Sequence, residues 1–261
     1  MPRFAANLTM LFTELPFMER FDAAHRAGFK SVEFLFPYAF DAAVIADKLK
    51  TYNLQQVLFN MPPGDWDAGE RGYAAIPGRE DEFKASVDTA LLYATILGCK
   101  RVHAMAGNVK PNENHNKYVE TFINNIRYAA DAFNQEGITL LIEPLNSRDM
   151  PGYFVSHQRD AVALIKQLNK SNVKLQLDTY HAQIMDGDLT TLIHDLYDEI
   201  GHIQIASVPD RHEPSDGEIN YSYLFRLLDE IGYQGWIGCE YNPEKTTEEG
   251  LGWVKPFLAT G

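Results

Sequence analysis

The stretches ITLLIEPLN (138–146), VKLQLDTYH (173–181), HIQIAS (202–207) and WIGCEY (236–241) decide the fold of this chain. Each is a short apolar run that carries one polar residue at or near its end: Glu143, Asp178, Gln204 and Glu240. Such β-branched and leucine-rich runs are typical of buried parallel strands. The four polar residues are 35, 26 and 36 positions apart, and one strand–helix–strand repeat takes roughly 30 residues. We therefore expect consecutive strands that aim four oxygen donors at one point.

The rest of the chain continues the same alternation of strands and helices. A length of 261 residues matches the typical (β/α)8 barrel of about 250 residues. No linker or break in composition divides the chain, so we predict a single α/β domain over residues 1–261, a (β/α)8 TIM barrel. An open doubly wound sheet is the alternative, but no glycine-rich nucleotide turn follows the first strand. The predicted strands are 3–12, 31–36, 54–61, 99–107, 138–146, 173–181, 202–207 and 236–241, and helices are predicted between them and at 246–259.

Composition excludes several classes of partner. No apolar run reaches the roughly 18 residues of a membrane helix, and the net charge of −13 repels nucleic acid and anionic lipid. We therefore expect neither a nucleic acid nor a membrane partner. The two cysteines, Cys99 and Cys239, form no metal-binding motif, which indicates a reducing, cytoplasmic location. The oligomeric state stays open, with a homo-oligomer as one option.

The four polar residues fall where barrel enzymes place their chemistry, at the carboxyl ends of the strands. Two glutamates, one aspartate and one amide oxygen suit a hard divalent cation such as Mg²⁺ or Mn²⁺. Any one of the acidic residues alone could instead cap a helix or form a surface ion pair. Because all four occur in register, we predict a metal site formed by Glu143, Asp178, Gln204 and Glu240.

A site of this kind favours an isomerisation. A divalent ion held by two neighbouring substrate oxygens polarises a carbonyl and acidifies the adjacent C–H. A carboxylate can then remove a proton from one carbon and return it to the next. Glu143 and Glu240 come from strands on either side of those that carry Asp178 and Gln204, so they would flank the substrate. The predicted reaction is an aldose–ketose type isomerisation through an enediolate, without an organic cofactor.

Two residues near these strand ends are candidates for substrate contacts. His181 follows Asp178 by three positions, and Arg211 follows the strand at 202–207. A lone histidine is more often a hydrogen-bonded structural residue, but His181 would lie at the barrel mouth. Arg211 is the nearest cation for an anionic substrate, although Asp210 or Glu213 could pair with it instead.

The segment 61–80 is a long loop rich in Gly, Pro and Asp, and long loops in compact domains are often functional lids. Arg71 and Arg79 in this lid are candidates to bind a substrate carboxylate, and Trp66 is a candidate to close over the ligand. Ion pairs within the lid and ordinary loop packing are the respective alternatives.

The chain resembles the hydroxypyruvate isomerase family of xylose-isomerase-like barrels nearly end to end. The resemblance includes IEPLN (142–146), QLDTYH (176–181) and DRHEPSDGEINY (210–221). The more specific motifs are GDWDAGERG (64–72) with IPGRE (76–80), and GEINY (217–221) before GWIGCEY (235–241). The resemblance implies a metal-dependent isomerase that acts on short 3-hydroxy-2-oxo acids. It also implies that Glu143 and Glu240 exchange the proton while they ligate the metal together with Asp178 and Gln204.

Two branches of that family are represented in the sequence. The opening 1–17 and the stretch IQIASVPDRHEP (203–214) resemble 2-oxo-tetronate isomerases, whose substrates carry four carbons, whereas FNMPPGDWDAGERG (59–72) and IEPLNSRDMPG (142–152) resemble hydroxypyruvate isomerases. We expect the interconversion of hydroxypyruvate and 2-hydroxy-3-oxopropanoate (tartronate semialdehyde), with 2-oxo-tetronate as the alternative substrate.

Two other enzymes that share the barrel are further alternatives. A ketose 3-epimerase would use the same two glutamates on a larger, neutral sugar. A metal-dependent apurinic endonuclease needs several histidines around zinc and a basic surface. The net charge of −13 and Gln204 in place of one histidine argue against the endonuclease.

Overall fold

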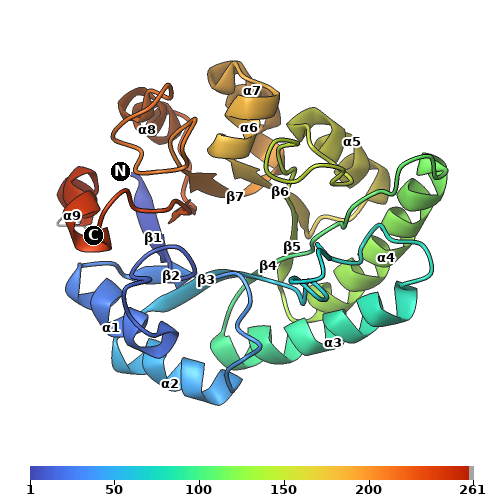
Figure 1. The fold of residues 1–261 in the computed structure, drawn as a ribbon, viewed down its shortest axis with the longest axis horizontal. Coiled ribbons are helices and arrows are strands. Elements are labelled where there is room, and N and C mark those ends of the chain that lie inside the picture. Colours follow the sequence, from blue (N-terminus) through green and yellow to red (C-terminus); the bar gives the residue numbers. More distant parts are fainter. Residues whose placement is uncertain (259–261) are drawn as a thin grey trace.

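The computed structural model describes residues 1–258, and its strands close into a parallel barrel in the order β1 to β8 (Figure 1). Each strand pairs with the next, and β8 closes on β1, where Phe4 lies opposite Ile237. The predicted (β/α)8 barrel is confirmed. The strands are β1 (Arg3–Asn7), β2 (Ser31–Glu33), β3 (Gln55–Asn60), β4 (Arg101–His103), β5 (Thr139–Ile142), β6 (Val173–Asp178), β7 (Ile200–Ile205) and β8 (Trp236–Cys239).

The helices form a ring around the outside of the strands (Figure 1). Within residues 1–258, no helix combines the length and the apolar character that crossing a bilayer requires. The helices are α1 (Phe17–Arg26), α2 (Ala42–Thr51), α3 (Glu80–Leu97), α4 (His115–Gln135), α5 (Gln158–Leu168), α6 (Thr179–Met185), α7 (Leu189–Leu196), α8 (Tyr221–Glu230), α9 (Thr247–Gly250) and α10 (Lys255–Leu258), with 3-10 turns at Tyr197–Glu199 and Leu251–Trp253.

Several predicted strands extend beyond the observed ones: the strand predicted over 3–12 ends at Asn7, and the one predicted over 99–107 is Arg101–His103. Two other elements differ in kind. The strand predicted over 173–181 ends at Asp178, because its carboxylate accepts a hydrogen bond from the Tyr180 backbone N–H at 2.8 Å and caps α6. Two helices therefore follow β6, so the predicted strict alternation is wrong there. The helix predicted over 246–259 is divided into α9, a 3-10 turn and α10, and residue 259 lies outside the described range.

The two faces of the strands differ in character. Outward side chains join the helices in one large hydrophobic cluster, which includes Phe21 of α1 and Phe122 of α4. A second, small cluster contains Ala5 and Leu141. Side chains two positions apart on a strand share a face, so Glu143 follows Leu141 on the same side, one layer nearer the carboxyl ends. The barrel interior thus changes from apolar to polar toward the end where catalysis is predicted.

Aromatic rings cover the seam where the first and last strands meet. Phe4 on β1 makes edge-on contacts with Phe225 of α8 and Trp253, with ring centroids 5.1 Å apart in both pairs. It makes a third edge-on contact with Phe257 of α10, at 5.2 Å. These contacts attach the C-terminal helices to the first strand.

Substitution of Phe4 by Ala should therefore lower the free energy of unfolding by about 3–5 kcal/mol, because it leaves a cavity among three rings. Urea denaturation measures the change. Leu92→Ala, at a side chain on α3 that is 58% exposed, is the control and should change stability by less than about 0.5 kcal/mol. Equal effects of the two substitutions would contradict a packed seam.

Candidate active site

The barrel brings the four predicted metal ligands to its carboxyl end. Glu143 directly follows β5, Asp178 ends β6, Gln204 lies in β7 and Glu240 directly follows β8. Asp178 and Gln204 are register partners on adjacent strands. The four residues are 5, 0, 1 and 6% exposed, so three carboxyl groups are buried in one small region.

Arg211, on the loop after β7, is the cation that faces these carboxylates. Its Nη2 donates to Glu240 Oε2 at 2.8 Å and lies 3.4 Å from Asp178 Oδ2. The guanidinium also lies over the Tyr180 ring, 4.8 Å from its centroid. The backbone of Arg211 is in the left-handed region, with φ of 57°. Among the described residues its ion pairs are with Asp178 and Glu240, not with the neighbouring acidic residues of its own loop.

Burial sets the protonation of the carboxyl groups. Burial, and then the charges of Glu240 and Asp178, raises the pKa of Glu143 well above its ordinary value. Burial also raises the pKa values of Glu240 and Asp178, although Arg211 opposes both shifts. Burial acts against the charge of Arg211, yet the three carboxylates raise its pKa overall. One guanidinium thus balances only part of the negative charge of three ionised carboxylates.

Three buried residues at this end of the barrel could hold a metal ion. Glu143, Asp178 and His181 each offer a potential ligand atom, and these atoms lie within 4.8 Å of one another. The Oε1 atom of Glu143 is buried and has no hydrogen-bond partner among the described residues. Burial lowers the pKa of the neighbouring His103 to about 3, so that imidazole, 3.3 Å from Glu143 Oε2, supplies no positive charge at neutral pH.

His181 faces the same carboxylates with a defined tautomer. Its Nδ1 accepts a hydrogen bond from the Asn146 backbone N–H at 3.1 Å, and a backbone N–H can only donate. Burial, and then the charge of Arg211, lowers the pKa of His181 well below its ordinary value, so the ring is neutral and its proton lies on Nε2. That nitrogen is 3.6 Å from Asp178 Oδ2. In this tautomer His181 presents a hydrogen-bond donor to the site, as a substrate contact requires.

A group of buried polar residues inside the barrel was not singled out from the sequence. The Nε2 atom of Gln204 donates to Glu33 Oε1 at 2.8 Å, and its Oε1 accepts from Gln176 Nε2 at 2.6 Å. Asn7 and His202 also contact Glu33. One signal was available: Glu33 is a charged residue within the apolar run SVEFLF (31–36).

The predicted lid at 61–80 is held by contacts of its own. Arg71 Nη1 donates to the carbonyl oxygen of Trp66 at 2.9 Å, and its guanidinium lies over the Trp66 ring, 3.8 Å from the centroid. The Trp66 ring packs against Phe36, just beyond β2, with centroids 5.2 Å apart. Substrate contacts by Arg71 and Trp66 stay predictions.

Ion pairs and a close backbone approach fix the rest of this lid. Arg79 pairs with Glu70 and Glu82, so the alternative of ion pairs around the lid is confirmed for Arg79. Gly72 has φ of 101°, and a Cβ atom there would lie 2.2 Å from the Met105 carbonyl oxygen. Glycine is therefore needed where the lid meets the segment after β4.

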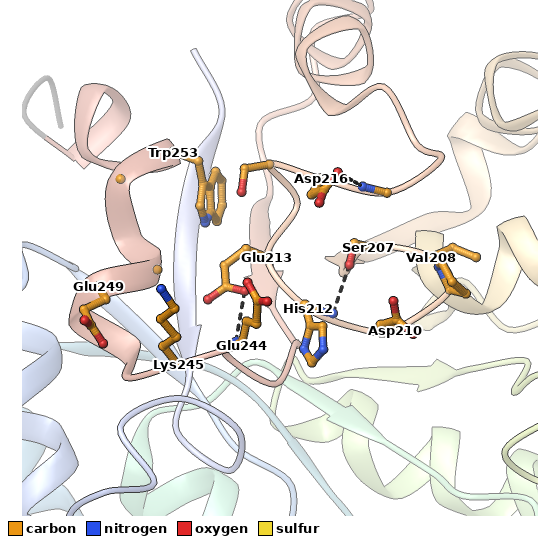
Figure 2. A pocket seen from close by; sticks show the side chains of 15 residues that line it. Ser207, Val208, Asp210, His212, Glu213, Asp216, Glu244, Lys245, Glu249 and Trp253 are labelled. Atoms are coloured by element: carbon orange, nitrogen blue, oxygen red, sulfur yellow. Dashed lines mark hydrogen bonds between the residues drawn. The ribbon is translucent and has the colours of Figure 1, made fainter.

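A cavity of about 770 Å³ lies next to the predicted site, between the loop after β7 and the segment after β8. Figure 2 shows its lining side chains, which include the two neighbours of Arg211, Asp210 and His212. None of the four predicted ligands lines it. Its acidic side chains outnumber its one lysine, Lys245, so the cavity would repel an anionic substrate. The acidic side chains that line the cavity are Asp210, Glu213, Asp216, Glu244 and Glu249.

Solved structures share the whole architecture. A crystal structure described as an AP endonuclease, family 2, from Brucella melitensis is 61% identical, has a TM-score of 0.97, and the match covers 98% of this chain and 99% of that one. The 3-keto-D-glucoside 4-epimerase YcjR from Escherichia coli has a TM-score of 0.81 at 19% identity, over 98% of this chain and 99% of that one. The latter likeness concerns the fold alone.

Proteins with similar sequences show which family the chain belongs to. A 2-oxo-tetronate isomerase from Pectobacterium atrosepticum is 52% identical over 99% of this chain and 98% of its own length. The hydroxypyruvate isomerase of Escherichia coli is 46% identical over 98% of this chain and 100% of its own length. The family model for the xylose isomerase-like TIM barrel matches residues 21–257. The chain belongs to the xylose isomerase-like TIM barrel family, among relatives that are isomerases.

Proposed function

We propose that the protein is a metal-dependent isomerase of short 3-hydroxy-2-oxo acids. The observation that carries the proposal is the pair of buried glutamates, Glu143 after β5 and Glu240 after β8, of which Glu240 forms an ion pair with Arg211. Two carboxyl groups with raised pKa values suit an exchange of protons with neighbouring substrate carbons. The names of the similar 2-oxo-tetronate and hydroxypyruvate isomerases support the same reaction type.

The four-carbon substrate is the preferred one. Hydroxypyruvate and 2-oxo-tetronate share the 3-hydroxy-2-oxo acid unit, and they differ by one CH₂OH group on C3. From the sequence we expected hydroxypyruvate, but two relatives named 2-oxo-tetronate isomerase are 52 and 50% identical, whereas the hydroxypyruvate isomerase of Escherichia coli is 46% identical. We therefore assign 2-oxo-tetronate as the better substrate and hydroxypyruvate as the smaller one that the same groups can process.

The metal would be held by Glu143, Asp178, Gln204 and Glu240, with Mg²⁺ or Mn²⁺ suited to these oxygen ligands. When bound, the ion supplies positive charge that polarises the 2-oxo group. Glu143 Oε1, which is buried and has no hydrogen-bond partner within residues 1–258, supports this assignment, as does the incomplete charge balance of the three carboxylates. His181, whose Nδ1 accepts from Asn146, is assigned to the substrate instead of the metal.

Side chains of the protein carry out the proton transfer and hold the substrate. One of Glu143 and Glu240 removes the proton from C3, and the other delivers a proton to C2. The proton of the C3 hydroxyl moves to the oxygen on C2, so that the 3-hydroxyl becomes the carbonyl and the 2-oxo group becomes the hydroxyl. His181 donates a hydrogen bond from Nε2 to a substrate oxygen. Arg211 binds the substrate carboxylate while it keeps contact with Glu240. Arg71 and Trp66 of the lid exclude water from the reacting carbons.

An endonuclease is a second candidate, because the 61% identical Brucella melitensis structure is described as one. The net charge of −13 opposes binding to a polyanion. The cluster of potential metal ligands found among the described residues contains one histidine, His181, and a zinc site of several histidines is not formed there. An incision assay on a plasmid that contains abasic sites should show no cleavage.

Isomerisation should be measurable directly by NMR in D₂O. With Mg²⁺ or Mn²⁺, the protein should convert 2-oxo-tetronate to the 3-oxo isomer with solvent deuterium in the product, and EDTA should abolish the reaction. The value of kcat/KM should be higher for 2-oxo-tetronate than for hydroxypyruvate. Faster turnover of a free ketohexose than of either acid would contradict the proposal in favour of a sugar epimerase.

Removal of either proton-transferring carboxylate should lower the turnover rate strongly. Glu143→Gln and Glu240→Gln should each lower kcat by about 10² to 10⁴, the usual range for one acid–base group. Glu120→Gln, at an exposed position on α4, is the matched control and should leave kcat unchanged. Full activity in Glu240→Gln would sink the two-glutamate mechanism.

The buried carboxyl groups also predict how stability depends on pH. In the metal-free protein the raised pKa values mean that Glu143, Asp178 and Glu240 hold protons more tightly folded than unfolded. The free energy of unfolding should thus fall as pH rises through the ordinary carboxyl pKa and up to the raised values, by at most about 1.4 kcal/mol per pH unit for each group. Saturating Mg²⁺ should remove this loss, because the ion binds the deprotonated carboxylates.

Urea denaturation between pH 5 and pH 8, with and without Mg²⁺, measures this dependence. The Glu143→Gln variant isolates one group, so its metal-free stability should fall less steeply than that of the parent protein. Identical slopes for the two proteins, or no effect of Mg²⁺ on either, would contradict the assignment of these carboxyl groups to a metal site.

A further inference from the structure

A buried carboxylate on β2 contacts one of the predicted metal ligands, Gln204 on β7. Glu33 ends β2 and is 0% exposed. Its Oε2 lies 2.7 Å from His202 Nε2 on β7. Its Oε1 accepts from Gln204 Nε2 at 2.8 Å and from Asn7 Nδ2 at 3.0 Å. Both oxygens of Glu33 are thus satisfied by side chains from β1 and β7, so the group is held firmly inside the barrel.

The contact with Glu33 decides which end of the Gln204 amide is free to bind a metal. An amide has an oxygen that accepts and a nitrogen that donates, and a carboxylate only accepts. Glu33 therefore holds the nitrogen end of Gln204, and the oxygen end is directed away from Glu33. Metal ions such as Mg²⁺ bind amide oxygens and not amide nitrogens. A reversed amide would remove Gln204 from the ligand set.

The other partner of this amide does not fix its orientation alone. Gln176 Nε2 donates to Gln204 Oε1 at 2.6 Å, which agrees with the same orientation. Gln176 is itself an amide, however, and its own Oε1 is buried without a hydrogen-bond partner among the described residues. Since Gln176 could reverse together with Gln204, the orientation of both depends on the acceptor-only group, Glu33.

The barrel leaves space for this carboxylate at one point on β8. A Cβ atom on Gly238 would lie 2.3 Å from Glu33 Oε1 and 2.4 Å from its Oε2. Gly238 is absent from the residues with positive φ, so its backbone conformation does not require glycine. The lack of a side chain at position 238 is needed because the Glu33 carboxylate occupies that volume.

We propose that Glu33 is a positioning residue for the metal site: it orients the Gln204 amide so that the oxygen is available as a ligand. This inference rests on the proposed function, because it takes Gln204 as a metal ligand. Glu33 itself contacts neither the metal nor the substrate. Its effect is transmitted through one hydrogen bond to Gln204.

Metal affinity of the stripped protein tests the proposal without any turnover. Mn²⁺ is titrated into metal-free protein, and free Mn²⁺ is followed by EPR. Glu33→Gln should weaken Mn²⁺ binding about 10- to 100-fold, the usual effect of losing a group that orients a ligand. An amide at position 33 can accept or donate, so it permits both orientations of Gln204. Ser31→Ala is the control and should stay within about twofold of the parent protein.

Ser31 is a matched control because it lies two residues before Glu33 on β2 and is equally buried. Its side-chain oxygen has no hydrogen-bond partner in the described part of the chain. Gly238→Ala serves as a second variant, since its methyl group displaces the Glu33 carboxylate without changing any charge. It should weaken Mn²⁺ binding as well. Thermal unfolding of each metal-free variant establishes that it is folded.

A double-mutant cycle separates a positioning role from a general structural one. Gln204→Ala removes the amide, so adding Glu33→Gln to it should change Mn²⁺ affinity by less than about twofold. The same 10-fold or larger loss in both backgrounds would overturn the proposal, and so would an unchanged affinity in Glu33→Gln. If the parent protein itself fails to bind Mn²⁺, the proposed metal site is overturned, and the inference about Glu33 falls with it.

Discussion

Burial of like charges is the constraint on which the rest of this structure depends. Glu143, Asp178 and Glu240 lie together at the carboxyl end of the barrel with almost no access to solvent. Carboxylates removed from water are costly unless a counter-charge or hydrogen bonds compensate them. Arg211 meets this need in part, and its left-handed backbone is tolerated because the guanidinium reaches both Asp178 and Glu240.

The fold stays stable with this polar interior because the two faces of each strand carry different kinds of side chain. Outward-facing residues such as Phe4 pack against the surrounding helices. Inward-facing residues two positions apart carry the polar groups, as with His202 and Gln204 on β7. Because a barrel has no free edges, its hydrogen-bonded ring keeps the inward side chains in register, which lets residues from distant strands share one site.

Much of the fold and part of the site could be predicted because the signals are local. Each apolar run predicts a strand on its own, and a carboxylate such as Glu143 or Glu240 at its end is visible without any structure. The contact between Glu33 and Gln204 could not be predicted, since it joins β2 to β7 across the barrel and no local pattern specifies that pairing. The end of β6 at Asp178 was missed for a related reason. Thr179 and Tyr180, which follow it, are residue types that favour strands, and the cap that starts α6 is one hydrogen bond.

The Glu33 carboxylate fills the volume that a side chain at position 238 would need, and this restricts which substitutions the sequence can accept. Positions 33 and 238 are far apart in the chain, yet one supplies a carboxylate and the other supplies the volume it occupies. A larger residue at position 238 displaces the Glu33 carboxylate unless position 33 becomes smaller at the same time, and in either case His202 and Gln204 lose their acceptor. Evolution or design can therefore exchange this pair only as a unit, together with the polar residues that depend on it.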